Sequence, residues 1–287
     1  MHSAFNLISA LSALFVLLME PCHCHGKTPP KLLIISFDGF HWDYIHKANV
    51  PNMQRMIKEG AWATKGLKNA FITKTFPDHW SMITGLYEES HGIVGNVFYD
   101  PDLNQTLHIW VHDEVTNPQW YTDSGEPIWV TNERQNTKQR SGSMMWPGAG
   151  PVIKGFMPYR TVYYDDTITL RQRIDTVIEW FTDEYPINLG LMYYPDPDHT
   201  GHMYGPNSPE IVKMVETLDS DIGYLFEKLK QKKLMSDMNI MLLSDHGMSE
   251  TIQDDEHKID LNKYIDFDSY IIDTESPIAT IRPKTKG

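Results

Sequence analysis

The chain has 287 residues, of which 41% are hydrophobic, and this is ordinary for a globular protein of one large or two small domains. It carries 25 Lys and Arg against 38 Asp and Glu, so its formal net charge at pH 7 is −13. This charge argues against nucleic acid as a general partner, because a phosphate backbone needs a basic face. A local phosphate site is still allowed if some of the acidic residues surround metal ions.

The N-terminus contains an almost unbroken apolar stretch over residues 4–18. It is shorter than the roughly 20 residues that span a bilayer, and it fits the apolar core of a secretory signal peptide. We therefore predict a signal peptide over residues 1–24 and a secreted or extracellular protein; a buried N-terminal helix is the alternative. The Asn-Gln-Thr triplet at Asn104 matches the N-glycosylation pattern, so Asn104 is a candidate glycosylation site.

Apolar runs and helix signals alternate along the rest of the chain. Short continuous apolar runs, typical of strands buried on both faces, lie at 31–37, 187–194 and 239–244. Helical spacing and helix start and stop residues predict helices at 50–62, 76–85, 166–184 and 208–234. This order predicts an α/β fold with a mainly parallel central sheet flanked by helices.

The stretch 97–160 has a different composition, rich in Trp, Pro, Gly, Asn and Thr. We expect loops and small strands here, including a short β-like piece at 127–132. Such loops cover the carboxyl ends of strands, where substrate pockets are built.

Three aspartates occupy the same position relative to predicted strands. Asp38, Asp198 and Asp245 each come at or soon after a strand end, and in an open parallel sheet ligands bind beyond those ends. Crowded carboxylates raise one another's pKa, which a bound cation would relieve. Because His202 and His246 lie near Asp198 and Asp245, the mixed imidazole and carboxylate set suits zinc. Taken singly, each Asp is better explained as part of a turn, and only the three together favour a metal site.

Thr75 stands at the predicted N-terminus of the helix at 76–85, as its N-cap, where backbone N–H groups and the helix dipole favour an anion. Its hydroxyl is a poor nucleophile unless a base or a metal lowers its pKa. A metal could activate it directly; a role as a helix cap alone is the alternative.

Several longer stretches carry a family resemblance: "SFDGFHWDY", "NAFITKTFPDHWSMITGLYEESHGIVGN", "PIWVTN", "MMWPG", "IEWFTDEYPINLGLMYYPDPDHTGHMYGP" and "LLSDHGM". The chain resembles the ectonucleotide pyrophosphatase/phosphodiesterase family of the alkaline phosphatase-like superfamily, in particular its short members. The matching stretches run from residue 31 towards the C-terminus, and motifs of this length and order are specific.

The resemblance implies two zinc sites. The positions that match the ligands of one zinc are Asp38, Thr75, Asp245 and His246, and the two that match the other are Asp198 and His202. Thr75 matches the nucleophile, which forms a covalent nucleotidyl-threonine intermediate, and Asn96 matches the side chain that helps bind the phosphoryl oxygen.

The resemblance also implies a nucleoside pocket lined by aromatic side chains. The matching positions are Phe76, Trp146, Tyr159 and Tyr193. Their alternative role is that of ordinary core aromatics.

Three departures from the family pattern stand out. The family's further histidine ligand, in an "HG-aromatic-D" stretch, is absent, as are the C-terminal elements and the membrane anchor of the short members. We therefore expect residues 25–287 to be a catalytic domain that is incomplete at its C-terminus, in which the strand at 276–283 lacks sheet neighbours. Asp78 stands where the family has an asparagine.

The expected function is a zinc-dependent phosphodiesterase or pyrophosphatase that hydrolyses small nucleotide-type phosphodiesters, with no nucleic-acid polymer as partner and no membrane span in this chain. One alternative is a catalytically inactive, truncated member that acts as a binding protein. Another is a choline-phosphate diesterase that acts on lysolipids.

Overall fold

The structure is a computed structural model that describes residues 30–136, 138–252, 254–274 and 276–284. The predicted signal peptide at 1–24 lies outside the described residues. None of the helices in the described ranges is long and apolar enough to cross a bilayer.

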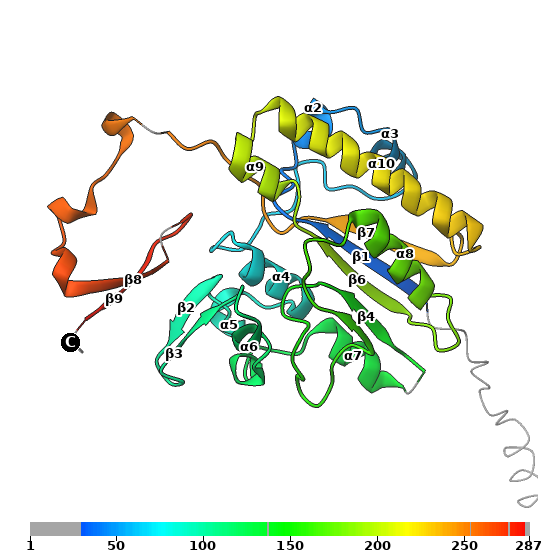
Figure 1. Cartoon of the computed structure of the whole chain (residues 1–287), viewed down its shortest axis with the longest axis horizontal. Coiled ribbons are helices and arrows are strands. Elements are labelled where there is room, and N and C mark those ends of the chain that lie inside the picture. Colours follow the sequence, from blue (N-terminus) through cyan, green and yellow to red (C-terminus); the bar gives the residue numbers. More distant parts are fainter. Residues whose placement is uncertain (1–29, 137, 253, 275, 285–287) are drawn as a thin grey trace, which may run out of the picture. The chain divides into compact units, whose positions relative to one another are not determined.

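A five-stranded parallel sheet forms the centre of the fold (Figure 1). Its strands lie in the order β5-β4-β6-β1-β7. Their bounds are Lys31–Phe37 for β1, Ser141–Met144 for β4, Arg160–Val162 for β5, Leu189–Tyr194 for β6 and Met238–Leu243 for β7. The three apolar runs identified in the sequence are the adjacent strands β6, β1 and β7, so the predicted mainly parallel α/β sheet is confirmed.

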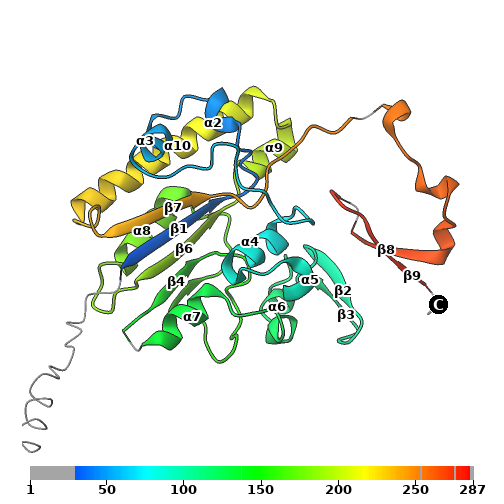
Figure 2. The ribbon, with the colours of Figure 1, turned by 180° about the vertical axis from the view of Figure 1, so that it is seen from behind.

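Helices cover both faces of this sheet, as Figures 1 and 2 show from opposite sides. On one face lie α8 (Leu170–Trp180) and α10 (Pro209–Gln231), and on the other lie α4 (Thr75–Thr84) and α7 (Ile128–Gln135). The other helices are α2 (Tyr44–Lys47), α3 (Pro51–Glu59), α5 (Glu88–His91), α6 (His112–Val115) and α9 (Asp198–Tyr204), and the 3₁₀ turns are η1 (Pro118–Tyr121), η2 (Asp255–His257), η3 (Leu261–Lys263) and η4 (Phe267–Ser269). All four predicted helices are present.

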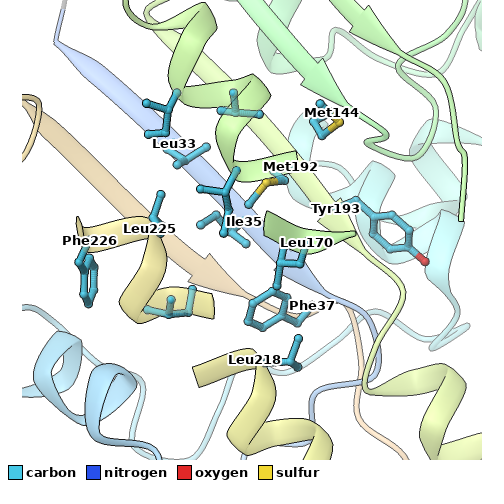
Figure 3. Packing of buried hydrophobic residues seen from close by; sticks show 14 of the residues in the cluster. Leu33, Ile35, Phe37, Met144, Leu170, Met192, Tyr193, Leu218, Leu225 and Phe226 are labelled. Atoms are coloured by element: carbon cyan, nitrogen blue, oxygen red, sulfur yellow. The ribbon is translucent and has the colours of Figure 1, made fainter. Parts of the chain in front are cut away.

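The two faces of β1 bury two separate apolar clusters. Leu33, Ile35 and Phe37 pack with the α8 and α10 side chains, whereas Ile34 belongs to the cluster under α4 and α7. This alternation follows from the two-residue period of a strand, with both faces apolar because both are covered. In Figure 3, Tyr193 lies at the edge of the first cluster with its hydroxyl oxygen pointing away from the apolar side chains.

The expectation of a β-like piece at 127–132 is wrong, because these residues begin helix α7. Pro127 precedes the helix, and Trp129 and Val130 are fully buried in the α4/α7 cluster. A short apolar run does not distinguish a buried strand from a buried helix turn. Here these residues form a helix that packs against α4.

The stretch 97–160 is also more than a cover of loops, because it supplies β4 to the central sheet between β5 and β6. The β4 sequence, Ser-Gly-Ser-Met, has no apolar run, yet all four residues are buried. Gly142 makes this possible, since a Cβ at that position would lie 2.6 Å from the Trp180 ring.

Two antiparallel hairpins lie outside the central sheet. One joins β2 (Val97–Asp100) and β3 (Gln105–His108), and the other joins β8 (Tyr270–Thr274) and β9 (Thr280–Pro283). The expectation that the strand at 276–283 lacks a neighbour is therefore wrong, since β9 pairs with β8. Asn104 lies exposed beside the first hairpin turn with φ +51°, a backbone conformation that Asn tolerates; its glycosylation stays a prediction.

Candidate active site

The three strand-end aspartates meet at the carboxyl edge of the sheet. Asp38 directly follows β1, Asp245 lies two residues beyond β7, and Asp198 opens α9 beyond β6. Backbone hydrogen bonds join these segments: the Gly39 N–H donates to Asp245 Oδ1 (3.0 Å), and the Asp198 N–H donates to the Asp38 carbonyl (2.9 Å). The convergence follows from β1 lying between β6 and β7.

Gly39 allows the β1 and β6 ends to approach this closely. Its φ is +67°, and a Cβ there would lie 2.7 Å from Asp198 Cβ. Any other residue would be strained by its backbone conformation and would push the Asp198 segment away.

Asp38, Asp198 and His246 form a candidate metal centre. Each offers one ligand atom, and these atoms all lie within 4.8 Å of one another. His246 Nε2 is 3.4 Å from Asp38 Oδ1 and 3.5 Å from Asp245 Oδ2. His202 lies further out, with a side chain that is 73% exposed and Nε2 at 3.5 Å from Asp198 Oδ2.

Three carboxylate oxygens without hydrogen-bond partners indicate that this centre suits a cation. Asp38 Oδ1, Asp198 Oδ1 and Asp245 Oδ2 are buried, and none of them has a hydrogen-bond partner. A buried polar atom without a partner is costly unless something else bonds to it. Three such oxygens beside an imidazole nitrogen are the donor set that a divalent metal such as zinc takes.

The electrostatics of the cluster agree with that fit. Burial and then repulsion from Asp245 raise the pKa of Asp38 to about 7, and burial with repulsion from Asp38 raises the pKa of Asp198 to about 6. Burial also raises the pKa of Asp245. Although burial lowers the pKa of His246, the Asp245 and Asp38 carboxylates raise it to about 9. A bound cation would reverse these shifts by favouring ionised carboxylates and a neutral ring.

Thr75 lies beside the carboxylates, and its Oγ1 donates to Asp38 Oδ2 at 3.3 Å. It is the first residue of α4, so the prediction of Thr75 as N-cap is wrong by one residue: Lys74 is the cap, without a side-chain hydrogen bond. The Phe76 N–H donates to Asn96 Oδ1 at 3.0 Å. This bond fixes the orientation of the Asn96 amide, because an N–H requires an oxygen acceptor, and leaves Nδ2 as its donor.

His79, one turn after Thr75 in α4, is a site residue that we did not predict. It is fully buried, and its Nδ1 lies 2.6 Å from the Thr75 carbonyl while Nε2 lies 2.8 Å from Ser36 Oγ. Burial lowers the pKa of His79 to about 4, so the ring is neutral, with the proton on Nδ1. Its spacing of four residues from Thr75 on one helix face was the available signal.

A cavity of about 610 Å³ opens beside Thr75 and Asp38. Three of the four predicted aromatic residues line it, namely Phe76, Trp146 and Tyr193, and the Tyr193 hydroxyl donates to Asp38 Oδ2 at 2.5 Å. Tyr163 and Tyr164, which we did not predict, also line it, as do Asp198 and His202.

Two of the predicted substrate-binding residues, Asn96 and Tyr159, are not among the residues that line the cavity. Asn96 accepts a hydrogen bond from the Phe76 N–H in the first turn of α4. The structure places Tyr159 away from the cavity, where its ring stacks against the Arg140 and Arg160 guanidinium groups at 5.2 and 5.1 Å.

Comparison with known proteins identifies relatives of similar sequence. Human ectonucleotide pyrophosphatase/phosphodiesterase family member 5 is 38% identical over 287 residues, which cover 99% of this chain and 58% of the relative. A bis(5'-adenosyl)-triphosphatase of Xenopus laevis is 39% identical over 267 residues, covering 91% of this chain and 57% of the relative. The chain therefore spans less than two thirds of the length of these relatives.

A solved structure is similar to this chain as well. Murine ectonucleotide pyrophosphatase/phosphodiesterase 5, as an inactive threonine-to-alanine variant in complex with AMP, matches with a TM-score of 0.82 at 38% identity, covering 89% of this chain and 66% of that one. The model of the type I phosphodiesterase / nucleotide pyrophosphatase family matches residues 32–287. The chain thus belongs to the type I phosphodiesterase / nucleotide pyrophosphatase family.

Proposed function

We propose that the protein is a secreted, zinc-dependent hydrolase of nucleotide-type phosphodiesters or pyrophosphates that works through a covalent phospho-threonine intermediate. The observation that carries this proposal is the meeting of three buried, unpartnered carboxylate oxygens from Asp38, Asp198 and Asp245 beside the Thr75 hydroxyl. Family membership supports the same reaction class.

Two groups of residues would hold the metal ions. Asp38, Asp245 and His246 with Thr75 would hold one, and Asp198 with His202 would supply part of the other. When bound, such ions act as Lewis acids towards the phosphoryl group and lower the pKa of hydroxyl groups near neutral pH.

Thr75 would give up its hydroxyl proton and attack phosphorus through Oγ1. A new P–O bond forms while the bond to the leaving alcohol or phosphate breaks, and the leaving oxygen takes up a proton. Asp38 orients the hydroxyl through the hydrogen bond to its Oδ2. Asn96 holds the first turn of α4 through the Phe76 N–H and directs its Nδ2 donor to a phosphoryl oxygen as charge develops there. Water then cleaves the threonine ester and frees the enzyme.

The cavity supports a nucleoside as the group bound next to the phosphate. Phe76, Trp146 and Tyr193 offer aromatic surface beside Thr75. A murine relative binds AMP, and it is inactive when a threonine is replaced by alanine. Both findings concern that relative, and they support the same roles here.

Replacement of Thr75 tests the proposal. The Thr75→Ala protein should lose hydrolysis of a nitrophenyl nucleotide ester by more than about 1,000-fold, because no other hydroxyl replaces the nucleophile, while its circular dichroism and melting temperature stay those of the parent. Thr75→Ser should keep part of the activity and form a nucleotidylated protein detectable by mass spectrometry.

Thr217→Ala, an exposed threonine on α10, is the matched control and should hydrolyse the ester at the parental rate. Parental turnover by Thr75→Ala would falsify the threonine mechanism. Comparing a dinucleoside polyphosphate with glycerophosphocholine as substrate decides between nucleotide and choline-phosphate diesters.

One observation favours the second candidate, a binding protein without turnover. The Asp198/His202 pair offers only two ligands, and among the described residues the ligand grouping found at this edge includes Asp198 but not His202. Metal analysis separates the two: two tightly held zinc ions per chain support the hydrolase, and one or none supports the binding protein.

A further inference from the structure

Arg173 is a buried cation in the middle of the apolar stripe of α8. Its relative exposure is 0%, and its neighbours on that face are apolar, among them Leu170, Ile174 and Val177. Among the described residues, no carboxylate oxygen lies within 4 Å of its guanidinium nitrogens, whereas the exposed Arg171 on the same helix pairs with Asp221. A buried, unneutralised guanidinium is costly, so its hydrogen bonds must compensate.

Three backbone carbonyls accept those hydrogen bonds. Nη1 donates to the Tyr193 carbonyl at 2.7 Å, Nη2 to the Asp165 carbonyl at 3.1 Å and Nε to the Ile168 carbonyl at 2.9 Å. The Tyr194 ring lies 5.0 Å from the guanidinium carbon. The planar guanidinium group thus joins the end of β6 to the turn at 165–168. A lysine amine could not donate to all three carbonyls in this geometry.

Both joined segments carry parts of the candidate site. Tyr193 donates its hydroxyl to Asp38 Oδ2, and the residues just before the turn, Tyr163 and Tyr164, line the cavity. Arg173 itself is not among the residues that line the cavity. Arg173 therefore contacts neither the cavity nor the carboxylates, but it fixes the backbone that presents both.

We propose that Arg173 is a positioning residue that sets the spacing between the tyrosine wall of the cavity, formed by Tyr163 and Tyr164, and the Asp38–Tyr193 pair. The proposal rests on the proposed function for its catalytic consequence. Without the guanidinium, the 165–168 turn loses two carbonyl bonds, the β6 end loses one, and the wall moves relative to Thr75. A displacement of about 1 Å at a reacting centre can cost about 100-fold in rate.

The test uses the full chain with Arg173→Met, which keeps side-chain volume without donors, and Arg173→Lys, which keeps the charge and part of the bonding. Steady-state kinetics on a nitrophenyl nucleotide ester should show kcat/KM about 100-fold lower for Met and about 10-fold lower for Lys, with KM raised in both. Hydrogen exchange should speed up at the amides of 161–169 and of residues 193, 194 and 196, while the β1 and α10 amides keep parental protection.

Arg171→Met, on the exposed side of α8, is the matched control and should change neither kcat/KM nor exchange at those amides. An Arg173→Met protein with parental KM and parental exchange at 161–169 would overturn the proposal. So would a uniform loss of protection over the whole chain, because that shows a general role in stability. A parent chain that hydrolyses no ester would overturn the proposed function alone, since hydrogen exchange still reports on Arg173.

Discussion

The two halves of the candidate metal site differ in how the fold holds them. The buried half consists of Asp38, Asp245 and His246, whose side chains are at most 10% exposed. The open half consists of Asp198 and His202, and the His202 side chain is 73% exposed. Both halves lie at the same sheet edge and use the same residue types.

The contrast shows where the geometry comes from. In the buried half, Asp245 Oδ1 accepts from the Gly39 and His246 N–H groups at 3.0 and 2.9 Å, so the strand ends themselves orient it. In the open half, His202 is placed only by one turn of α9. The buried half is therefore organised before any ion binds, while the open half has little to hold His202 in place.

The largest effect should come from breaking the buried half. Asp245→Ala removes a ligand and leaves the Gly39 N–H without its acceptor, so hydrolysis should fall by more than about 1,000-fold, with one zinc ion lost from the purified protein. Ester hydrolysis and metal analysis measure this. Asp102→Ala, an exposed aspartate near the β2–β3 turn, is the control, and a fully active Asp245→Ala protein would show that the buried half binds no functional metal.

Breaking the open half should cost less. His202→Ala removes one exposed ligand, so activity at micromolar zinc should fall by roughly 10-fold to 100-fold and recover at millimolar zinc, because affinity rather than architecture is lost. A zinc titration of activity checks this, with the exposed His257→Ala as control. Equal, unrecoverable losses in the Asp245 and His202 variants would contradict the difference between the halves.

The smallest effect concerns Asp78, a buried carboxylate next to the site that is not a predicted ligand. Asp78 Oδ2 has no hydrogen-bond partner, and burial raises the pKa of Asp78 from 3.8 to about 7. Between these values the unfolded chain loses this proton and the folded chain keeps it. Stability therefore falls as pH rises through that window, and the penalty is complete above about pH 7.

Asp78→Asn removes this titration and keeps an oxygen acceptor for the Ala70 N–H. Its melting temperature should exceed that of the parent by roughly 5 °C at pH 8, and the difference should vanish near pH 4. Thermal denaturation at both pH values measures this, with the exposed Asp255→Asn as control. A gain that is equal at both pH values would mean that ionisation of Asp78 is not the cause.

Sequence alone predicted the parts of the fold that depend on continuous apolar runs. β1, β6 and β7 are buried on both faces, so their composition identified them, and their parallel order brought Asp38, Asp198 and Asp245 together. β4 was missed because three of its four residues, Ser141, Gly142 and Ser143, are small and only Met144 is apolar, so no continuous apolar run marks the strand. The helix α7 was misread for the opposite reason, since its apolar run is equally compatible with a strand.

The candidate site was predictable where a residue acts through its own chemistry. Thr75, His246 and the three aspartates carry groups that suit phosphate and metal chemistry. Arg173 and His79 were not predicted, because their importance lies in the backbone carbonyl groups to which they hydrogen-bond. Sequence spacing does not show those contacts. Tyr163 and Tyr164 line the cavity because of the course that the backbone takes before the 165–168 turn. Amino-acid composition does not specify that course.

The Asp38–Gly39 pair at the end of β1 has a consequence for how this site can vary. Asp38 offers a ligand oxygen, while Gly39 supplies the N–H for Asp245 and the missing side chain that lets Asp198 approach. An added methyl group at residue 39 would separate the β1 and β6 segments although no ligand had changed. Neither residue of the pair can therefore be replaced without damage to the site. A chain that kept every metal ligand but lost this glycine would still carry the ligand side chains, but they would no longer lie at the distances that a metal ion requires.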